Sequence, residues 1–194
     1  MSDSWDDYAD GWDENQDVVV YAEKAFSALT EQVDINNLSI LDFGCGTGLL
    51  TAKMAQNAKS VHAIDTSNKM IEVLNNKAID NISTQVVEVS ESWLKENNHL
   101  LDTFDLITAS SVFAFVDDYH QTLLLLKQLL KPDGKIVQWD WQKSQQEPEF
   151  GFNQQDIKDG FTQANIELLT ISNPFSLKSK QGDAKVIMAT GQMN

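Results

Sequence analysis

The sequence predicts an α/β protein with the architecture of a three-layer sandwich. Its middle layer is a seven-stranded, mostly parallel sheet with a C-terminal antiparallel hairpin, and helices cover both faces. Two observations carry this prediction. As far as residue 164, short apolar runs alternate with segments of helical periodicity, which is the order of repeated βα units. The last two apolar runs are joined by a polar stretch without a helical period, which favours antiparallel pairing.

The elements follow one another regularly along the chain. The predicted strands are residues 39–43, 60–65, 84–89, 104–109, 135–141, 166–172 and 184–190. The predicted helices are residues 15–33, 49–58, 67–74 with Ser67 as N-cap, a Leu-rich helix capped by Asp117 or Asp118, and 154–164, with a weaker polar segment at 91–99. Turn chemistry is expected at residues 131–134, and a loop beginning at residues 173 and 174 is expected to join the last two strands.

The most informative stretch is residues 41–48, LDFGCGTG, which lies between the first strand and the following helix. Its three alternate glycines allow a sharp turn and a close approach to a ligand. Asp65 ends the next strand, 21 residues after Gly44, so its carboxylate is expected beside the glycine loop, where it can accept hydrogen bonds from ribose hydroxyls. Leu49 occupies the position of the third glycine of GxGxxG, which argues against a dinucleotide site.

These residues resemble motif I of the class I S-adenosylmethionine-dependent methyltransferases, whose usual form is close to LDxGCGTG. Residues 65–70 are similar to the segment that follows the second strand in that family, and a weaker similarity extends from about Trp5 to Gly191. The resemblance implies a Rossmann-like fold, S-adenosylmethionine as cofactor and S-adenosylhomocysteine as product. It is closest to the small-molecule type of methyltransferase.

The resemblance also implies which residues contact the cofactor. The glycine-loop backbone holds the methionine end, Asp65 binds the ribose, and Ser110 contacts the methionine portion. The adenine edge meets either Glu91 or Ser90 with backbone groups, because the sequence departs there from the family's common Gly-Asp-Ala form. The full set of implied cofactor residues is Asp42, Gly44, Cys45, Gly46, Gly48, Asp65, Thr66, Met70, Glu91 and Ser110.

Composition and charge restrict the class of partner. The formal net charge is −15 and all 14 basic residues are lysines, which disfavours nucleic acids and anionic membrane surfaces. No apolar run approaches the roughly 20 residues of a membrane helix, and the acidic N-terminus is unlike a leader, so a cytoplasmic protein is expected. Cys45 is the single cysteine, and the three histidines lack ligand spacing, so no metal site is expected.

Residues 1–194 are interpreted as one domain, with residues 1–14 as an N-terminal lid. The aromatic and acidic residues 5–13 resemble the opening of many small-molecule methyltransferases, in which this segment folds over the cofactor. Docking on the core away from the site is the alternative interpretation. Near the expected mouth of the site, one of the pairs Gln138 and Asp140 or Trp139 and Trp141 is expected to supply polar anchors for an acceptor and the other its apolar walls. Packing in the core is the alternative interpretation of the two tryptophans.

The predicted function is transfer of the cofactor's methyl group to a small-molecule acceptor by in-line displacement. A general base is needed only when the nucleophile arrives protonated, so catalytic residues stay unassigned, with His120, Asp140 and Tyr8 as candidates by location. The alternatives are a non-catalytic cofactor-binding or regulatory protein, and a protein or RNA methyltransferase. The oligomeric state is left open between a monomer and a homodimer.

Overall fold

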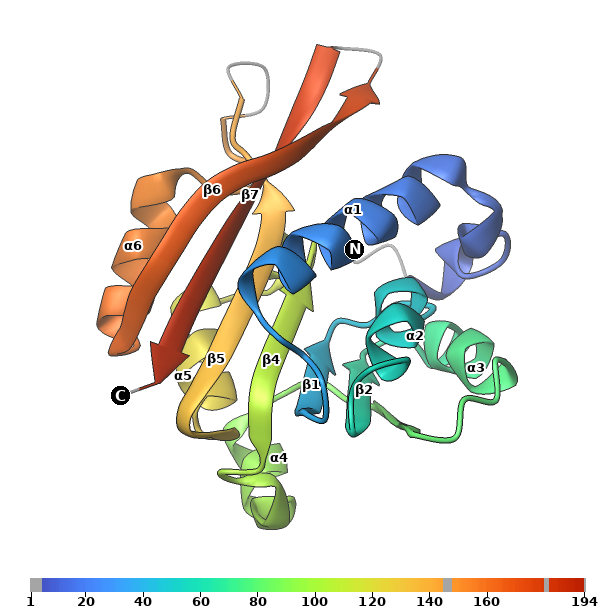
Figure 1. Cartoon of the computed structure of the whole chain (residues 1–194), viewed down its shortest axis with the longest axis vertical. Coiled ribbons are helices and arrows are strands. Elements are labelled where there is room, and N and C mark those ends of the chain that lie inside the picture. The colour runs from blue at the N-terminus through green and yellow to red at the C-terminus, as the bar shows by residue number, and fades with distance from the viewer. Residues whose placement is uncertain (1–4, 145–147, 180–181, 194) are drawn as a thin grey trace. The chain divides into compact units, whose positions relative to one another are not determined.

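A computed structural model describes residues 5–144, 148–179 and 182–193 (Figure 1). The chain divides into two compact units, Met1–Glu88 and Val89–Asn194. They are called unit 1 and unit 2 and are described in turn.

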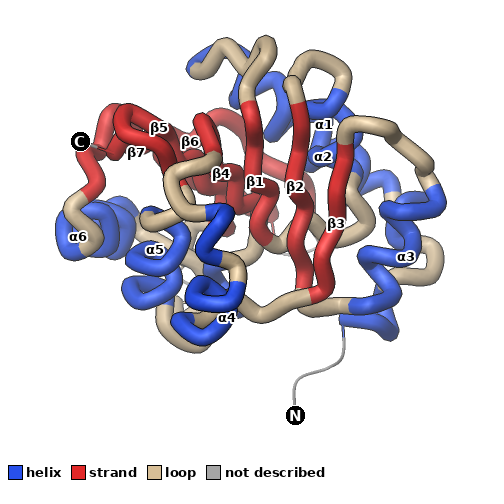
Figure 2. The backbone as a smooth tube through the Cα atoms, turned by 90° about the horizontal axis from the view of Figure 1, so that it is seen from below, coloured by secondary structure: helices blue, strands red, loops and turns tan. Residues whose placement is uncertain are grey.

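Unit 1 contains three parallel strands in the order β3-β2-β1, which run side by side in Figure 2. Its elements are η1 (Trp5–Tyr8), η2 (Trp12–Glu14), α1 (Gln16–Gln32), β1 (Ser39–Phe43), α2 (Leu49–Ala55), β2 (Ser60–Asp65), α3 (Asn68–Asn76) and β3 (Ile82–Val86). Phe43 pairs with Ile64, and Asp65 pairs with Val86. The carboxyl ends of the three strands therefore lie at one edge, where parallel sheets bind ligands.

Side-chain caps begin two helices of unit 1. The Asn15 side chain accepts a hydrogen bond from the backbone of Asp17 at the start of α1, and Ser67 Oγ accepts from Met70 N at 3.1 Å at the start of α3. The predicted N-cap at Ser67 is confirmed. Helix α2 ends at Ala55 rather than at residue 58.

Unit 2 combines one parallel and two antiparallel strand pairs. Its elements are α4 (Glu91–Glu96), η3 (Asn98–Leu100), β4 (Phe104–Ser110), η4 (Phe113–Phe115), α5 (Tyr119–Lys127), β5 (Leu130–Trp141), α6 (Gln154–Gln163), β6 (Ile166–Ser179) and β7 (Gly182–Met193). Strand β5 is parallel to β4 and antiparallel to β7, which is antiparallel to β6. Figure 1 shows β6 and β7 as a long ribbon pair beside β5.

The strand pairs β1–β2, β2–β3 and β4–β5 are parallel, and β6 and β7 form the C-terminal antiparallel pair, which confirms the predicted fold class. Besides the early end of α2, three differences from the prediction concern β3, β5 and the hairpin. Strand β3 covers Ile82–Val86 instead of residues 84–89. The Val87 N–H still donates to Asp65 O at 2.8 Å, and beyond this residue the chain leaves the sheet and leads to α4. Residues 131–134 form an irregularity inside β5, where Asp133 has a φ of 63°.

The third difference concerns the hairpin. Residues 173 and 174 were expected in a connecting loop, but both lie within β6, where the register with β7 shifts between Ser172 and Phe175. The shift accommodates a proline, which has no N–H to donate to the ladder. The two strands are accordingly much longer than the apolar runs that predicted them.

Candidate functional site

The glycine loop follows β1 and has three glycines with positive φ. Gly44, Gly46 and Gly48 have φ angles of 69°, 54° and 80°. The backbone N–H groups of Gly44 and Cys45 both donate to Ile64 O, at 2.9 Å and 3.1 Å. These two hydrogen bonds fix the loop to the end of β2.

Gly46 and Gly48 are needed for different physical reasons. A Cβ added to Gly46 would meet nothing within 4 Å, so this part of the loop faces open space. A Cβ on Gly48 would lie 2.3 Å from Leu74 Cδ1, because α3 packs directly against the start of α2. Gly48 thus allows close helix packing, while Gly46 leaves the loop backbone accessible to a ligand.

Asp65 joins the loop to the end of β2. Its Oδ2 accepts from Gly46 N at 2.8 Å, and its Oδ1 accepts from Ser67 N at 2.9 Å. Burial raises the pKa of this carboxyl, an effect that the three backbone donors at Gly46, Thr66 and Ser67 partly offset, and the Asp6 charge raises it further. Each carboxylate oxygen retains acceptor capacity, which fits a ribose that offers two hydroxyl donors.

Two other residues of the motif have structural contacts. Asp42 is buried, and its Oδ2 accepts from Thr51 Oγ1 at 2.6 Å, which ties β1 to α2. The Cys45 thiol retains some exposed surface but is crowded by protein atoms, and this burial raises its pKa, as do the charges of Asp42 and Asp65. A thiol that stays protonated is a poor nucleophile, in keeping with a packing role for Cys45.

The N-terminal segment contacts the residues that follow Asp65. Asp6 Oδ1 accepts from Ser67 Oγ at 2.5 Å and from Lys69 N at 3.1 Å, at the start of α3. The hydrogen bond from Ser67 is the largest cause that lowers the pKa of Asp6. An anion is stabilised at this position, because the first N–H groups of a helix point toward it.

A second acid of the same segment contacts the glycine loop itself. Asp13 Oδ1 accepts from Thr47 Oγ1 at 2.5 Å, and Asp13 Oδ2 lies 2.6 Å from Lys77 Nζ. In the same segment, the rings of Trp5, Tyr8 and Trp12 contact one another, with centroids 5.8 to 6.4 Å apart. The segment therefore lies against the loop and α3 rather than on a distant part of unit 1.

The roles of Asp6, Asp13, Thr47 and Lys77 were not recognised from the sequence. The density of acids among residues 5–13 was the available signal, but a charged segment usually faces solvent. Tyr8, a candidate base, belongs to the ring cluster and is half exposed.

The remaining predicted cofactor residues differ in exposure. In unit 1, Thr66 is exposed and Met70 is buried in α3. In unit 2, Glu91 is an exposed first residue of α4, 4.0 Å from Lys95, and Ser110 ends β4.

Unit 2 buries a group of polar side chains at the carboxyl end of β5. Asp140 and Gln138 are fully buried and lie on one face of the strand, two residues apart. Tyr119 of α5 donates its hydroxyl to Gln138 Oε1 at 2.6 Å. Among the described residues, Gln138 Nε2 and both oxygens of Asp140 lack a partner at hydrogen-bonding geometry, although the Ala114 N–H is close enough to influence the carboxyl.

Burial raises the pKa of Asp140 well above its ordinary value, and the Ala114 N–H lowers it only in part. Burial and the Asp140 charge likewise raise the pKa of Tyr119. His120, the third candidate base, has its ring 5.5 Å from that of Tyr119, and its Nδ1 also lacks a partner in the described part of the chain. Asp140 and His120 thus both lie near Tyr119.

The segment before α6 folds back onto the end of β5. Phe152 N donates to Trp141 O, and Lys143 N donates to Phe152 O, both at 2.9 Å. Gly151 has a φ of 83°, and a Cβ there would lie 2.1 Å from Trp141 O. Only glycine allows this close approach of the two backbones.

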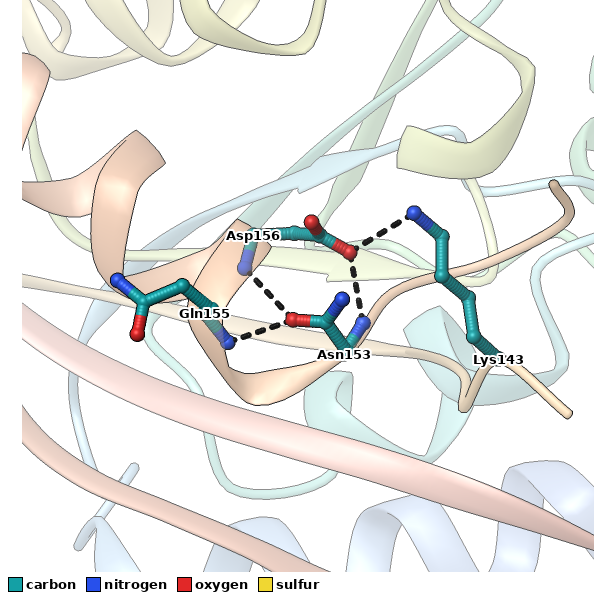
Figure 3. A network of polar contacts seen from close by, with 4 residues as sticks. All are labelled: Lys143, Asn153, Gln155 and Asp156. Atoms are coloured by element: carbon teal, nitrogen blue, oxygen red, sulfur yellow. Dashed lines mark hydrogen bonds and ion pairs between the residues drawn. The ribbon is translucent and has the colours of Figure 1, made fainter. Parts of the chain in front are cut away.

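Figure 3 shows the polar network that fixes the base of this segment. Asn153 and Asp156 form a reciprocal capping box at the start of α6, and Lys143 Nζ lies 3.0 Å from Asp156 Oδ2. The network holds Phe152 against Tyr119, with ring centroids 4.7 Å apart.

The described residues contain no cluster of three or more His, Cys, Asp or Glu side chains suited to a metal ion. No helix within the described ranges is both long and apolar enough to cross a membrane.

Comparison with known proteins agrees with this geometry. A family model for a methyltransferase domain matches residues 41–136. The malonyl-[acyl-carrier protein] O-methyltransferase of Halalkalibacterium halodurans is 30% identical over 101 residues, which cover 51% of this chain and 37% of that protein. The mitochondrial ubiquinone biosynthesis O-methyltransferase of Schizosaccharomyces pombe is 35% identical over 99 residues, covering 50% and 36%.

A solved structure extends the likeness over most of the chain. A SAM-dependent methyltransferase from Aquifex aeolicus superposes with a TM-score of 0.70 over 87% of this chain and 88% of that one, at 18% identity. The chain belongs to the class I S-adenosylmethionine-dependent methyltransferases, and S-adenosylmethionine is the cofactor of that family. The matched region spans less than two fifths of the length of the two curated relatives.

Proposed function

We propose that this protein transfers the methyl group of S-adenosylmethionine to an oxygen atom of a small-molecule acceptor by in-line displacement. One observation carries the proposal: the Asp65 carboxylate accepts from Gly46 N at 2.8 Å while the loop backbone at Gly46 faces open space. A partly buried acceptor of hydrogen bonds and an accessible glycine loop thus meet at the carboxyl ends of β1 and β2. This is the combination that a nucleoside with an attached amino-acid chain requires.

In this proposal Asp65 receives the ribose hydroxyls, and the backbone of residues 44–48 holds the methionine end. The cofactor, when bound, supplies a methyl group that its positive sulfur already activates. The protein's own task is then alignment and exclusion of water. Glu91 and Ser110 remain proposals for the adenine edge and the methionine portion.

The N-terminal segment serves as a lid in this account. Asp6 and Asp13 attach it to Ser67 and Thr47, which flank the two cofactor-binding loops of unit 1. The cluster of Trp5, Tyr8 and Trp12 would then shield the cofactor from water. Residues 1–4 of the proposed lid lie outside the described part of the chain.

A small acceptor is supported by charge and by the relatives. The net charge of −15 would repel a nucleic acid at long range. The two curated relatives described above are named O-methyltransferases, which favours oxygen as the attacking atom.

The test is to incubate the purified chain with S-adenosylmethionine carrying a labelled methyl group and a panel of hydroxylated metabolites. We expect label in a small-molecule product, and none with Asp65→Ala. Cofactor binding without transfer to any acceptor would favour a non-catalytic cofactor-binding protein. Transfer to protein or RNA alone would contradict the small-molecule proposal.

A further inference from the structure

The N-terminal segment of unit 1 carries charge of one sign. The first basic residue of the chain is Lys24, so residues 5–14 contain no cation of their own. Among the described residues, none of the exposed acids Asp7, Asp10 and Glu14 forms an ion pair. An excess of one charge creates a negative potential that acts beyond direct contact.

Two further acids of this segment contact the proposed cofactor site, and their charges are offset to different degrees. The charge of Asp13 is paired with Lys77, whose Nζ lies 2.6 Å from Asp13 Oδ2. Asp6 instead accepts from the uncharged hydroxyl of Ser67 and from a backbone N–H, and the Lys69 ammonium acts on it from beyond ion-pair distance. Asp6 is therefore the contacting acid that keeps most of its charge.

Ser67 connects Asp6 to Asp65. Its Oγ donates to Asp6 Oδ1 at 2.5 Å, and its backbone N–H donates to Asp65 Oδ1 at 2.9 Å. The two carboxylates thus lie on either side of one residue. The Asp6 charge is among the causes that raise the pKa of Asp65, after the larger effect of burial. The negative potential of the segment therefore extends to the residue proposed to bind the ribose.

The sulfur atom of the cofactor joins the ribose to the amino-acid chain. Asp65 is the proposed partner of the ribose and the glycine loop that of the amino-acid chain. These two partners are adjacent, because Asp65 Oδ2 accepts from Gly46 N at 2.8 Å. The sulfur is positive in S-adenosylmethionine. Methyl transfer leaves the electron pair of the broken carbon–sulfur bond on sulfur, so it is neutral in S-adenosylhomocysteine.

We propose that Asp6 is a specificity-determining residue which, together with the exposed acids of residues 5–14, increases the preference of the site for S-adenosylmethionine over S-adenosylhomocysteine. This role rests on the cofactor site proposed above and adds the residue that distinguishes substrate from product by charge. A fixed negative potential stabilises the ligand that has the additional positive charge and contributes little to the other. The product becomes easier to release once the charge is lost.

A preference for the methylated ligand could also come from side chains that pack around the methyl group. The two origins differ in their response to salt. The screening length of water falls from about 30 Å at about 10 mM salt to about 3 Å at about 1 M. A preference that comes from Asp6 and the exposed acids is therefore reduced by salt, whereas a preference that comes from packing is not.

Asp6→Asn is the decisive variant. Both hydrogen bonds of the Asp6 side chain are accepted by Oδ1, and an amide oxygen can accept them too, so the substitution removes charge and keeps the contacts. Glu31→Gln is the matched control, because it removes an exposed carboxylate from the last turn of α1. That helix has 17 residues and is about 25 Å long, so Glu31 is remote from residues 5–14.

The experiment measures dissociation constants by calorimetry for the full chain and both variants, at about 10 mM and about 1 M salt. The ligands are S-adenosylmethionine, S-adenosylhomocysteine and sinefungin. In sinefungin a carbon atom that carries a protonated amine takes the place of the methylated sulfur, so the positive charge is kept without the methyl group. Thermal unfolding checks that each variant is folded.

We expect Asp6→Asn to bind both charged ligands about threefold more weakly at low salt, with S-adenosylhomocysteine affinity unchanged. Glu31→Gln should bind all three ligands like the parent chain. At high salt, the parent chain and Asp6→Asn should show the same ratio of S-adenosylmethionine to S-adenosylhomocysteine affinity, because the charge of Asp6 is then screened.

The role of Asp6 is refuted by an unchanged ratio in folded Asp6→Asn, or by an equal change in Glu31→Gln. It is also refuted if S-adenosylmethionine weakens while sinefungin does not, since contacts with the methyl group would then explain the effect. In each of these cases normal S-adenosylhomocysteine binding would leave the cofactor site intact. A parent chain that binds none of the three ligands would refute the cofactor site and the role of Asp6 together.

Discussion

Thr47 donates a hydrogen bond to Asp13 at 2.5 Å, joining the glycine loop to a segment 34 residues earlier in the chain. The same Asp13 pairs with Lys77 beyond the end of α3. A single carboxylate thus connects the N-terminal segment to both sides of the proposed cofactor site in unit 1. If this segment is the lid proposed above, cofactor exchange requires these contacts to open.

Asp13→Asn should accelerate release of S-adenosylhomocysteine. The amide keeps the side-chain size but loses the ion pair with Lys77, and a partly buried charged contact of this kind contributes roughly 0.5–1.5 kcal/mol. We expect a dissociation rate about 2- to 10-fold higher by stopped-flow fluorescence. Asp10→Asn, at an exposed acid of the same segment, is the control, and equal rates for both variants would refute the lid.

Asp65→Asn should weaken S-adenosylhomocysteine binding by about 10- to 100-fold, as the loss of charged hydrogen bonds predicts. The amide NH₂ cannot accept from a ribose hydroxyl, and it also faces the N–H of Gly46 or Ser67. Calorimetry measures the affinity and thermal unfolding checks that the variant is folded. An unchanged dissociation constant in a folded variant would remove Asp65 from the site.

Gly46→Ala and Gly48→Ala should separate backbone strain from packing. Both residues have positive φ, which costs an alanine about 1–2 kcal/mol. Gly48→Ala adds a clash with Leu74, so it should be the less stable variant in chemical denaturation. Gly46→Ala should remain folded and lose cofactor affinity, and unaltered affinity there would mean that the loop does not bind the ligand.

Asp140→Asn should remove part of the pH dependence of stability. The folded state binds a proton at Asp140 more tightly than the unfolded state, so this contribution is complete below the ordinary pKa of 3.8 and is lost as the pH rises through the raised pKa. The slope for one proton is at most about 1.4 kcal/mol per pH unit. Denaturation across this range should show the parent losing stability relative to Asp140→Asn as the pH rises, whereas parallel curves would contradict burial of the carboxyl.

The predictable parts of the fold and site follow from local chemistry. Residues 41–48 and Asp65 were identified because strand, glycine loop and acid are close in sequence and have a fixed spacing. Ser67 was recognised as a cap for the same reason. The position of β3 was less predictable, because β-branched residues continue past Val86 while the chain already turns toward α4.

The contacts of Asp6 and Asp13 depend on tertiary structure, since their partners are 61 and 34 residues away. No local pattern distinguishes these acids from Asp7 or Asp10. The lengths of β6 and β7 could not be predicted for a similar reason. The outer parts of these strands are polar, so pairing between the two strands, and not an apolar pattern in the sequence, maintains them.

The most direct test of the central claim compares melting temperatures with S-adenosylmethionine, S-adenosylhomocysteine and NAD. A ligand at about 100 times its dissociation constant stabilises the folded state by roughly 2.7 kcal/mol, which is a shift of several degrees for a chain of this size. We predict stabilisation by S-adenosylmethionine and S-adenosylhomocysteine, no shift with NAD, and a smaller shift with the first two ligands in Asp65→Asn. No response to either of the first two ligands would contradict the account.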